Sequence, residues 1–340
     1  MVKPVLLSLP CVLAVLILAG CGSSTETANG SSASSHGSGG TDLKGAISID
    51  GSSTVGPISE AIAEEFGKAN PGVRPTVGIS GTGGGFKKFA NGEIDIAGAS
   101  RPIEDKEKAA CAANKVEFVE IPIAYDGLSI VVNPKNDFLK DITTAELKKI
   151  WQGNSRVKTW ADVRAGFPAQ PIKLYGPGSD NGTFDYFTEA ICGKKGDSRT
   201  DYQASATPNT LIQGIAGDQY ALAYFGFAYY EQNQDKLKLV TVNGIAPTKE
   251  TILNGTYTPL SRPLFWYVKA SSLDRPEVKA FVNFLLKQGK PLIESTGYIA
   301  LPDSAYASGQ TLVDGKKVGT RFKDGETGLK IEDVLNREPK

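Results

Sequence analysis

The chain has 340 residues, with 37 basic and 37 acidic side chains and a formal net charge of zero. This length suits about two domains. Because Lys and Arg are scattered rather than gathered in runs, the charge pattern excludes an electrostatic surface for nucleic acid or for an anionic membrane.

The N-terminal segment has the pattern of a secretory signal. An apolar run from Val5 to Ala19 is short for a transmembrane helix and typical of a signal peptide. The sequence LAGC that ends at Cys21 resembles the lipobox of bacterial lipoproteins. We therefore expect a signal peptide over 1–20 and lipidation of Cys21, with an ordinary secretory signal and a chance Cys as the alternative.

The segment after Cys21 predicts a flexible tether over 21–44. From 22 to 40 nearly every residue is Ser, Gly, Thr or Ala, and none is large and apolar enough to build a core. The only histidine of the chain, His36, lies in this segment. A Ser-His-Asp triad therefore has no base in the folded part.

A unit of strand, hydroxyl-rich turn and helix recurs along the folded part. Residues 46–50 alternate as a strand, and a helix follows with Pro57 in its first turn. The unit recurs over 73–93 and over 172–191, and short apolar strands are expected over 94–100, 116–125 and 128–134. Strands alternating with helices predict an α/β fold with largely parallel sheets and a ligand at the strand C-termini.

Three turns carry Ser, Thr and Gly at predicted strand ends: Gly51–Val55, Ser80–Gly85 and Gly178–Thr183. Such a turn before a helix can direct several N–H groups at an anion. Each turn alone could be an ordinary helix cap, but three together favour an oxyanion site between two lobes. The glycine-rich turn fits neither nucleotide motif, because Phe86 stands where each would have its last Gly.

Two cysteines remain in the folded part, Cys111 and Cys192. Outside the cytoplasm they could form a disulfide, or they could be two small buried thiols. The sequence leaves both alternatives open.

Six segments, taken in chain order, resemble the phosphate-binding lipoproteins that serve bacterial phosphate ABC importers: DGSSTVGPI, SGTGGGFKKFANGEIDIAGASRPI, IPIAYDGLSIVVNP, YGPGSDNGTFDYF, ALAYFGFAYY and YTPLSRPLFWYV. The resemblance implies the two-lobed periplasmic-binding-protein fold (type II), each lobe a mixed sheet flanked by helices, with the ligand in the cleft. It implies a first lobe over 45–131 and 262–340 and a second over 132–261. It also implies a membrane-anchored monomer that captures inorganic phosphate outside the membrane and delivers it to a permease.

The resemblance places phosphate ligands in all three turns and after the strand at 94–100. These residues are Ser53, Thr54, Val55, Thr82, Gly83, Ser100, Asn181, Gly182 and Thr183.

The chain departs from the family pattern at two charged positions. Arg101 stands where many members have an Asp, and Pro177 where those members have an Arg. We expect Arg101 to replace the lost cation, since its planar guanidinium can bind two oxyanion oxygens. Asp126, slightly favoured over Asp180, would accept the phosphate proton; each Asp could instead cap a turn or pair with Arg101. Without such an acceptor, sulfate or molybdate becomes the expected ligand.

Two other classes of protein are alternatives. A secreted Ser-dependent hydrolase or phosphatase would use Ser52, Ser53 or Ser179, and a Ser-Lys mechanism stays open. An adhesin or scaffold would use the aromatic segment 224–230, which the alternative interpretation places in the core. No Cys or His cluster has the spacing of a zinc site. We favour the binding protein, with no catalytic residue, cofactor or metal.

Overall fold

The computed structural model describes residues 43–179, 181–205, 207–322 and 331–340. The chain divides into two compact units, 1–40 and 41–340, and the description concerns the second. The predictions of a signal peptide, a lipidated Cys21 and a tether up to residue 42 lie outside the described residues, as does Asp180. Within the described ranges, every helix is too short or too polar to cross a bilayer.

The first sheet region is mixed. β1 lies between β2 and β3 and is parallel to both, while β10 is antiparallel to β3 and to β4. β11 adds a short antiparallel pairing to β4. The bounds are β1 (Gly45–Gly51), β2 (Val73–Ile79), β3 (Ile96–Ala99), β4 (Phe118–Val132), β10 (Ser261–Lys269) and β11 (Ile299–Ala300).

The second sheet region continues from the end of β4. β8 and β9 are antiparallel to β4, β6 is parallel to β8 and to β7, and β5 is parallel to β9. The bounds are β5 (Asp141–Ile142), β6 (Lys173–Gly176), β7 (Gln203–Ala204), β8 (Ala221–Gly226) and β9 (Lys238–Val242).

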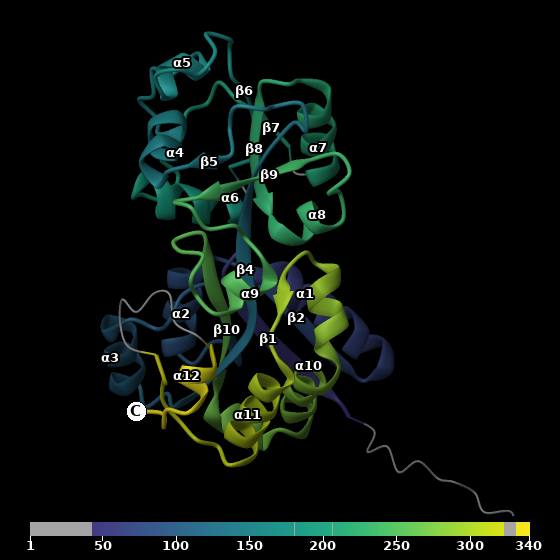
Figure 1. Cartoon of the computed structure of the whole chain (residues 1–340). Helices are drawn as coiled ribbons and strands as arrows, with labels where there is room; N and C mark the ends of the chain where they lie inside the picture. The colour runs from purple at the N-terminus through teal and green to yellow at the C-terminus, as the bar shows by residue number, and fades with distance from the viewer. Residues whose placement is uncertain (1–42, 180, 206, 323–330) are drawn as a thin grey trace, which may run out of the picture. The chain divides into compact units, whose positions relative to one another are not determined.

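β4 belongs to both sheet regions (Figure 1). Up to Gly127 it pairs with β10, and from Leu128 it pairs with β8. All 15 of its residues are buried. The sequence predicts two strands here, 116–125 and 128–134, and this is wrong: Asp126 and Gly127 change the pairing partner without interrupting the strand.

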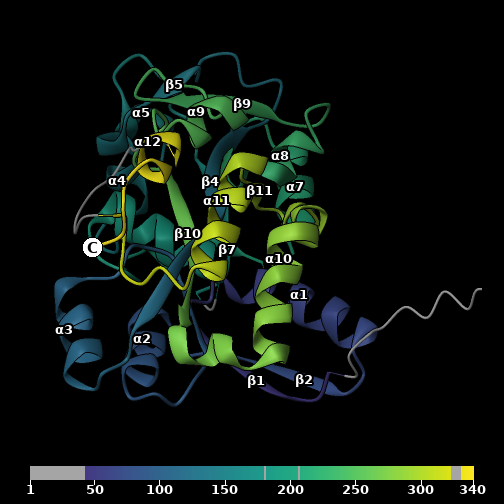
Figure 2. The ribbon, with the colours of Figure 1, turned by 90° about the horizontal axis from the view of Figure 1, so that it is seen from below.

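Helices cover the two regions. α10 packs against α1 through Phe281 and Phe66, whose ring centroids are 5.2 Å apart, and Figure 2 shows the two helices side by side. The helices are α1 (Gly56–Ala69), α2 (Thr82–Ala90), α3 (Asp105–Ala113), α4 (Thr144–Trp151), α5 (Trp160–Val163), α6 (Gly182–Phe187), α7 (Pro208–Gly217), α8 (Phe227–Glu231), α9 (Lys249–Leu253), α10 (Pro276–Ser295), α11 (Asp303–Asp314) and α12 (Ile331–Leu335), with a π-helix η1 (Thr188–Cys192) and a 3₁₀-helix η2 (Ala270–Asp274).

The predicted strand–turn–helix units are confirmed as β1–α1, β2–α2 and β6–α6. The expectation of largely parallel sheets is wrong, because β4, β10 and their partners pair antiparallel, whereas the mixed sheet implied by the family resemblance is confirmed. In the aromatic segment, Tyr224 and Phe225 are buried, so these two aromatics belong to the core.

Cys111 and Cys192 are free and buried, so the disulfide alternative is not realised. Burial raises the pKa of each thiol to about 11, which makes both unreactive at neutral pH. The alternative of two buried thiols is confirmed.

Thr143 and Glu146 form a capping box at the start of α4, and Arg164 extends it. The Glu146 carboxylate accepts hydrogen bonds from the Thr143 N–H (2.9 Å) and from Nε and Nη2 of Arg164 (both 2.7 Å). The Arg164 hydrogen bonds are the main reason that the pKa of Glu146 falls to about 2.

Glu146→Gln should lower stability at pH 7 by about 1–3 kcal/mol, since it removes charge-assisted hydrogen bonds. A lowered pKa stabilises the fold fully above the unfolded value of about 4.3, and this contribution disappears as the pH falls toward 2. The difference in thermal unfolding between wild type and variant should therefore shrink between pH 5 and about 2. The exposed Glu117→Gln is the control, and a penalty that does not change with pH would contradict the prediction.

Candidate functional site

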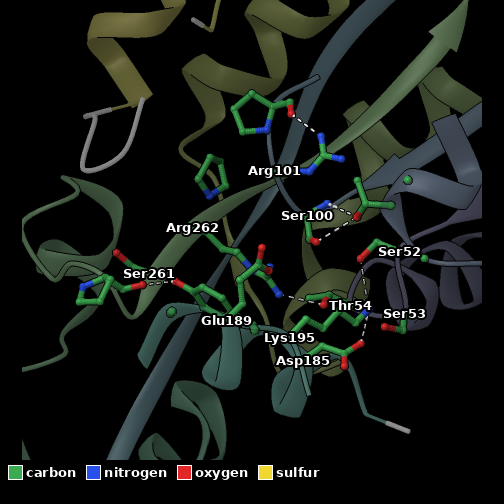
Figure 3. Close-up of a pocket in the computed structure, with 18 of the residues that line it drawn as sticks. Ser52, Ser53, Thr54, Ser100, Arg101, Asp185, Glu189, Lys195, Ser261 and Arg262 are labelled. Carbon is green, nitrogen blue, oxygen red and sulfur yellow. Dashed lines mark hydrogen bonds and ion pairs between the residues drawn. The ribbon is translucent and has the colours of Figure 1, made fainter. Parts of the chain in front are cut away.

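The turns after β1, β2 and β3 line one cavity of about 570 Å³, which we call the first cavity. β10 and the segment of α6 and η1 complete its wall (Figure 3). Because β1, β2 and β3 are parallel, their carboxyl ends meet at one edge, as predicted for a ligand site. The turn residues in the wall are Ser52, Ser53, Thr54, Ser80, Gly81, Thr82, Gly83, Gly84, Ser100 and Arg101.

Gly85 in the glycine-rich turn and Gly78 just before it are required by packing against β1. A Cβ on Gly85 would lie 2.6 Å from the Cα of Gly51, and one on Gly78 would lie 2.4 Å from Oδ2 of Asp50. Gly81 has a φ of +78°, which only glycine adopts readily, and it is the N-cap of α2. A Cβ on Gly83 would meet nothing within 4 Å. The run of glycines therefore brings α2 against β1 and leaves the first turn of the helix accessible.

Asp50 fixes this turn in place. Its Oδ1 accepts hydrogen bonds from the backbone N–H (3.0 Å) and the hydroxyl (2.6 Å) of Ser80, and its Oδ2 pairs with Lys88. Burial alone would raise the pKa of Asp50, but Lys88 and Ser80 together hold it below its usual value. The ionised carboxylate thereby positions the N-terminus of α2 at the cavity, where the first amides of a helix lack intrahelical partners.

Three predicted hydroxyls meet at the first cavity. Oγ1 of Thr82 lies 3.1 Å from Oγ of Ser100, so the turns after β2 and β3 are in direct contact. Thr54, from the turn after β1, lines the same cavity and is nearly fully buried. These groups are neutral hydrogen-bond donors, which suit an anion without excess positive charge.

Arg262 on β10 is a cation of this cavity that the sequence pattern did not predict. Its Nη2 donates to Oγ1 of Thr54 (3.0 Å) and lies 3.5 Å from Oδ2 of Asp126, which is its cross-strand partner on β4. The guanidinium lies 3.6 Å from the ring centre of Tyr186, and the side chain is 14% exposed. Its Nε is buried without a hydrogen-bond partner within the described part of the chain. The guanidinium is thus oriented by an aromatic face and a carboxylate and keeps unused donor capacity.

Arg101 also lines the first cavity, but its guanidinium is engaged elsewhere. Nη1 and Nη2 donate to the two carboxylate oxygens of Glu107 (2.9 and 2.8 Å), and Nε lies 3.1 Å from Glu104. Both carboxylates belong to the capping box of α3. This pairing does not support the expectation that Arg101 binds the anion, because its donors already hold the start of a helix.

Val55 is a second predicted donor whose geometry does not fit. It is fully buried, it is absent from the wall of the first cavity, and its N–H donates to the carbonyl of Ser52 (3.1 Å). The hydroxyl of Ser52 accepts from the N–H of Thr54 (3.2 Å). The first turn therefore uses these groups to start α1, and Ser53 and Thr54 are left to face the cavity.

The remaining predicted residues line a second cavity of about 440 Å³. It contains Asp126, Asn181, Gly182 and Thr183, and it shares Ser53 with the first cavity. Gly182 lies directly against the first turn, since a Cβ on it would be 2.5 Å from Oγ1 of Thr54. The structure thus brings the predicted residues together as two adjoining groups.

Asp126 is 1% exposed and lies at the junction of these groups. Burial raises its pKa, and the neighbouring Arg262 acts in the opposite direction. The other predicted acceptor, Asp180, lies outside the described residues. Among the described residues no cluster of His, Cys, Asp and Glu could hold a metal ion.

The fold, together with turns whose neutral donors suit an anion, indicates the class of this protein: a receptor for an oxyanion. A family model described as a PBP superfamily domain matches residues 26–288. The chain therefore belongs to the PBP superfamily.

Individual relatives make the relationship more specific. The chain is similar to the protein SphX of Synechococcus elongatus, with 47% identity over 300 residues that cover 86% of this chain and 88% of the relative. It is also similar to the phosphate-binding protein PstS of Staphylococcus saprophyticus, with 41% identity over 277 residues that cover 80% of this chain and 85% of the relative.

Solved structures agree with these relatives. A possible phosphate binding protein from Planctomyces limnophilus has a TM-score of 0.77 and 48% identity, with 80% of this chain and 99% of that chain covered. An ABC-type phosphate transport receptor from Vibrio cholerae has a TM-score of 0.61 and 25% identity, with 75% and 100% covered.

Gly85→Ala should destabilise the protein by about 1–3 kcal/mol, because the new methyl group would overlap backbone atoms of β1. Gly83→Ala is the matched control two residues away, where the methyl group meets open space and stability should stay equal or rise slightly. Urea denaturation of both variants measures the difference. Equal midpoints would contradict the packing role assigned to Gly85.

Proposed function

We propose that this protein is an extracytoplasmic solute-binding protein that captures inorganic phosphate and delivers it to an ABC importer. The observation that carries this proposal is the convergence of the hydroxyls of Thr54, Thr82 and Ser100 with the guanidinium of Arg262 on one cavity. Relatives described as a phosphate-binding protein and as an ABC-type phosphate transport receptor support the same ligand and the same transport role.

Arg262 is the cation of the proposed phosphate site. A guanidinium and a phosphate match in geometry, and hydrogen bonds between charged groups are the stronger ones. The hydroxyls and the first amides of α2 supply the remaining donors, with Gly83 exposed at the point where α2 starts. Ser53, shared by both cavities, connects this group to Asn181, Gly182 and Thr183.

Asp126 is the proposed acceptor for the phosphate proton. Near neutral pH phosphate carries a proton and sulfate does not, so a carboxylate beside the anion accepts a hydrogen bond from the first and repels the second. Its contact with Arg262 places Asp126 next to the proposed cation. Binding of sulfate or molybdate is the alternative if this carboxylate does not contact the anion.

Two lobes are proposed to close on the ligand, with the first over 45–131 and 262–340 and the second over 132–261. The sheet pairing supports these boundaries, because β4 exchanges β10 for β8 after Gly127 and β10 begins at Ser261. Opening by a hinge at these two crossings would move α6 away from the turns of the first sheet region, against which Gly182 lies in this structure.

Attachment to the membrane is a proposal that rests on the sequence pattern alone. We propose that residues 1–20 are removed, that Cys21 is lipidated, and that the following tether lets a monomer reach its permease. Catalysis is not part of the proposed function. The chain's only His lies in the proposed tether, and the hydroxyl of Ser52 is used to cap the turn before α1.

Isothermal titration calorimetry should show saturable binding of one phosphate per protein. Arg262→Met should weaken it by about ten- to a hundredfold, the effect of losing a charged hydrogen-bond donor. Arg101→Met is the matched control: it should lower thermal stability, because it leaves the nearly buried Glu107 unpaired, while affinity changes by less than about threefold. If Arg101→Met weakens binding and Arg262→Met does not, Arg101 is the cation that binds phosphate. If the wild type does not bind phosphate, the proposed function is wrong.

Asp126→Asn should reduce the preference for phosphate over sulfate by about tenfold or more, because an amide can donate to a bare anion. Competition titrations with sulfate measure the ratio of the two dissociation constants. Asp180→Asn is the comparison variant. If Asp180→Asn changes the ratio and Asp126→Asn does not, the proton acceptor is Asp180.

A further inference from the structure

The wall of the first cavity on the side of α6 and η1 carries charges of its own. Asp185 lies on α6, Glu189 on η1 and Lys195 in the segment that follows η1, and all three line the first cavity together with Thr54 and Arg262. Figure 3 shows the side chains of Lys195 and Asp185 beside Thr54. This wall therefore presents an ammonium group and two carboxylates to the site proposed for phosphate.

The ammonium group of Lys195 forms an ion pair with Asp185. Its Nζ lies 2.7 Å from Oδ2 of Asp185, and the two side chains are 55% and 22% exposed. Ion pairs with this much exposure contribute little to stability, so the pair is easily exchanged. Arg101 differs, because its fork-like pair with Glu107 involves a carboxylate that is only 8% exposed.

The carboxylates of Asp185 and Glu189 make a cation such as Lys195 necessary in this wall. Asp185 and Glu189 line the cavity in which an anion is proposed to bind. Their negative charges would repel the anion. Lys195 offsets one of them while it remains paired. If its ammonium group turns to the anion, it adds a second attraction beside that of Arg262.

We propose that Lys195 is the second cation of the phosphate site and that Asp185 holds it in reserve until phosphate binds. This inference rests on the proposed phosphate-binding function. Lys195 contacts the anion, and Asp185 acts as a positioning residue whose carboxylate competes with the anion for the ammonium group.

Phosphate titrations of four variants test the proposal. Lys195→Met should weaken phosphate binding by about tenfold, whereas Lys194→Met, an exposed neighbour that does not line the cavity, should leave it unchanged. Asp185→Asn should tighten binding by about two- to fivefold, because the ammonium group is released. Glu189→Gln measures the gain from removing a carboxylate that does not hold Lys195, and this gain should be smaller than that of Asp185→Asn.

The double variant Lys195→Met/Asp185→Asn separates the proposed role from simple charge removal. In the Lys195→Met background, Asp185→Asn should gain no more affinity than Glu189→Gln gains in the wild type. The association rate of the Lys195→Met variant should also depend less on ionic strength. Thermal melts of all variants are also needed. A purely structural ion pair predicts that Lys195→Met and Asp185→Asn lower the melting temperature by similar amounts.

Two results would overturn the proposal while leaving the phosphate-binding function intact: equal affinities of Lys195→Met and Lys194→Met, or an equal gain from Asp185→Asn in both backgrounds. Absence of phosphate binding by the wild type would overturn both.

Discussion

The antiparallel pairing of β4 with β10 is the constraint on which the site depends. It places Arg262 opposite Asp126 and brings the guanidinium to Thr54, 208 residues away in the sequence. A buried guanidinium is stable only where a carboxylate and polar atoms receive its donors, and here Asp126, Thr54 and the face of Tyr186 fulfil that condition. The donors left over are then available to a ligand at no further cost in ordering the side chain.

Local patterns predicted the part of the site that local structure builds. Thr54, Thr82 and Ser100 follow parallel strands, and the carboxyl ends of neighbouring parallel strands necessarily meet, so their common cavity followed from the strand–turn–helix pattern. Arg262 could not be found in this way, since its place depends on the register of an antiparallel strand far along the chain. The one sequence feature that could have indicated Arg262 is its position in the segment YTPLSRPLFWYV, which resembles the phosphate-binding lipoproteins.

Arg101 shows the opposite case, in which a local signal was available in the sequence and was not used. Glu104 and Glu107 follow it directly in the sequence, at the spacing of a capping box, and the structure pairs both with the guanidinium. A cation three and six residues from such carboxylates is more readily satisfied by them than by a ligand. The glycine-rich turn is similar, because Gly78 and Gly85 are required by close packing against β1 and Gly81 by its positive φ, rather than by a ligand.

The continuity of β4 has a consequence for how the protein loses its structure. The 15 consecutive buried residues of β4 are divided between two sheet regions. Unfolding of either region would therefore remove the strand partners of about half of β4 and expose apolar surface. Neither half can become a long-lived partly folded species on its own. We therefore expect the two regions to open together, as one foldon.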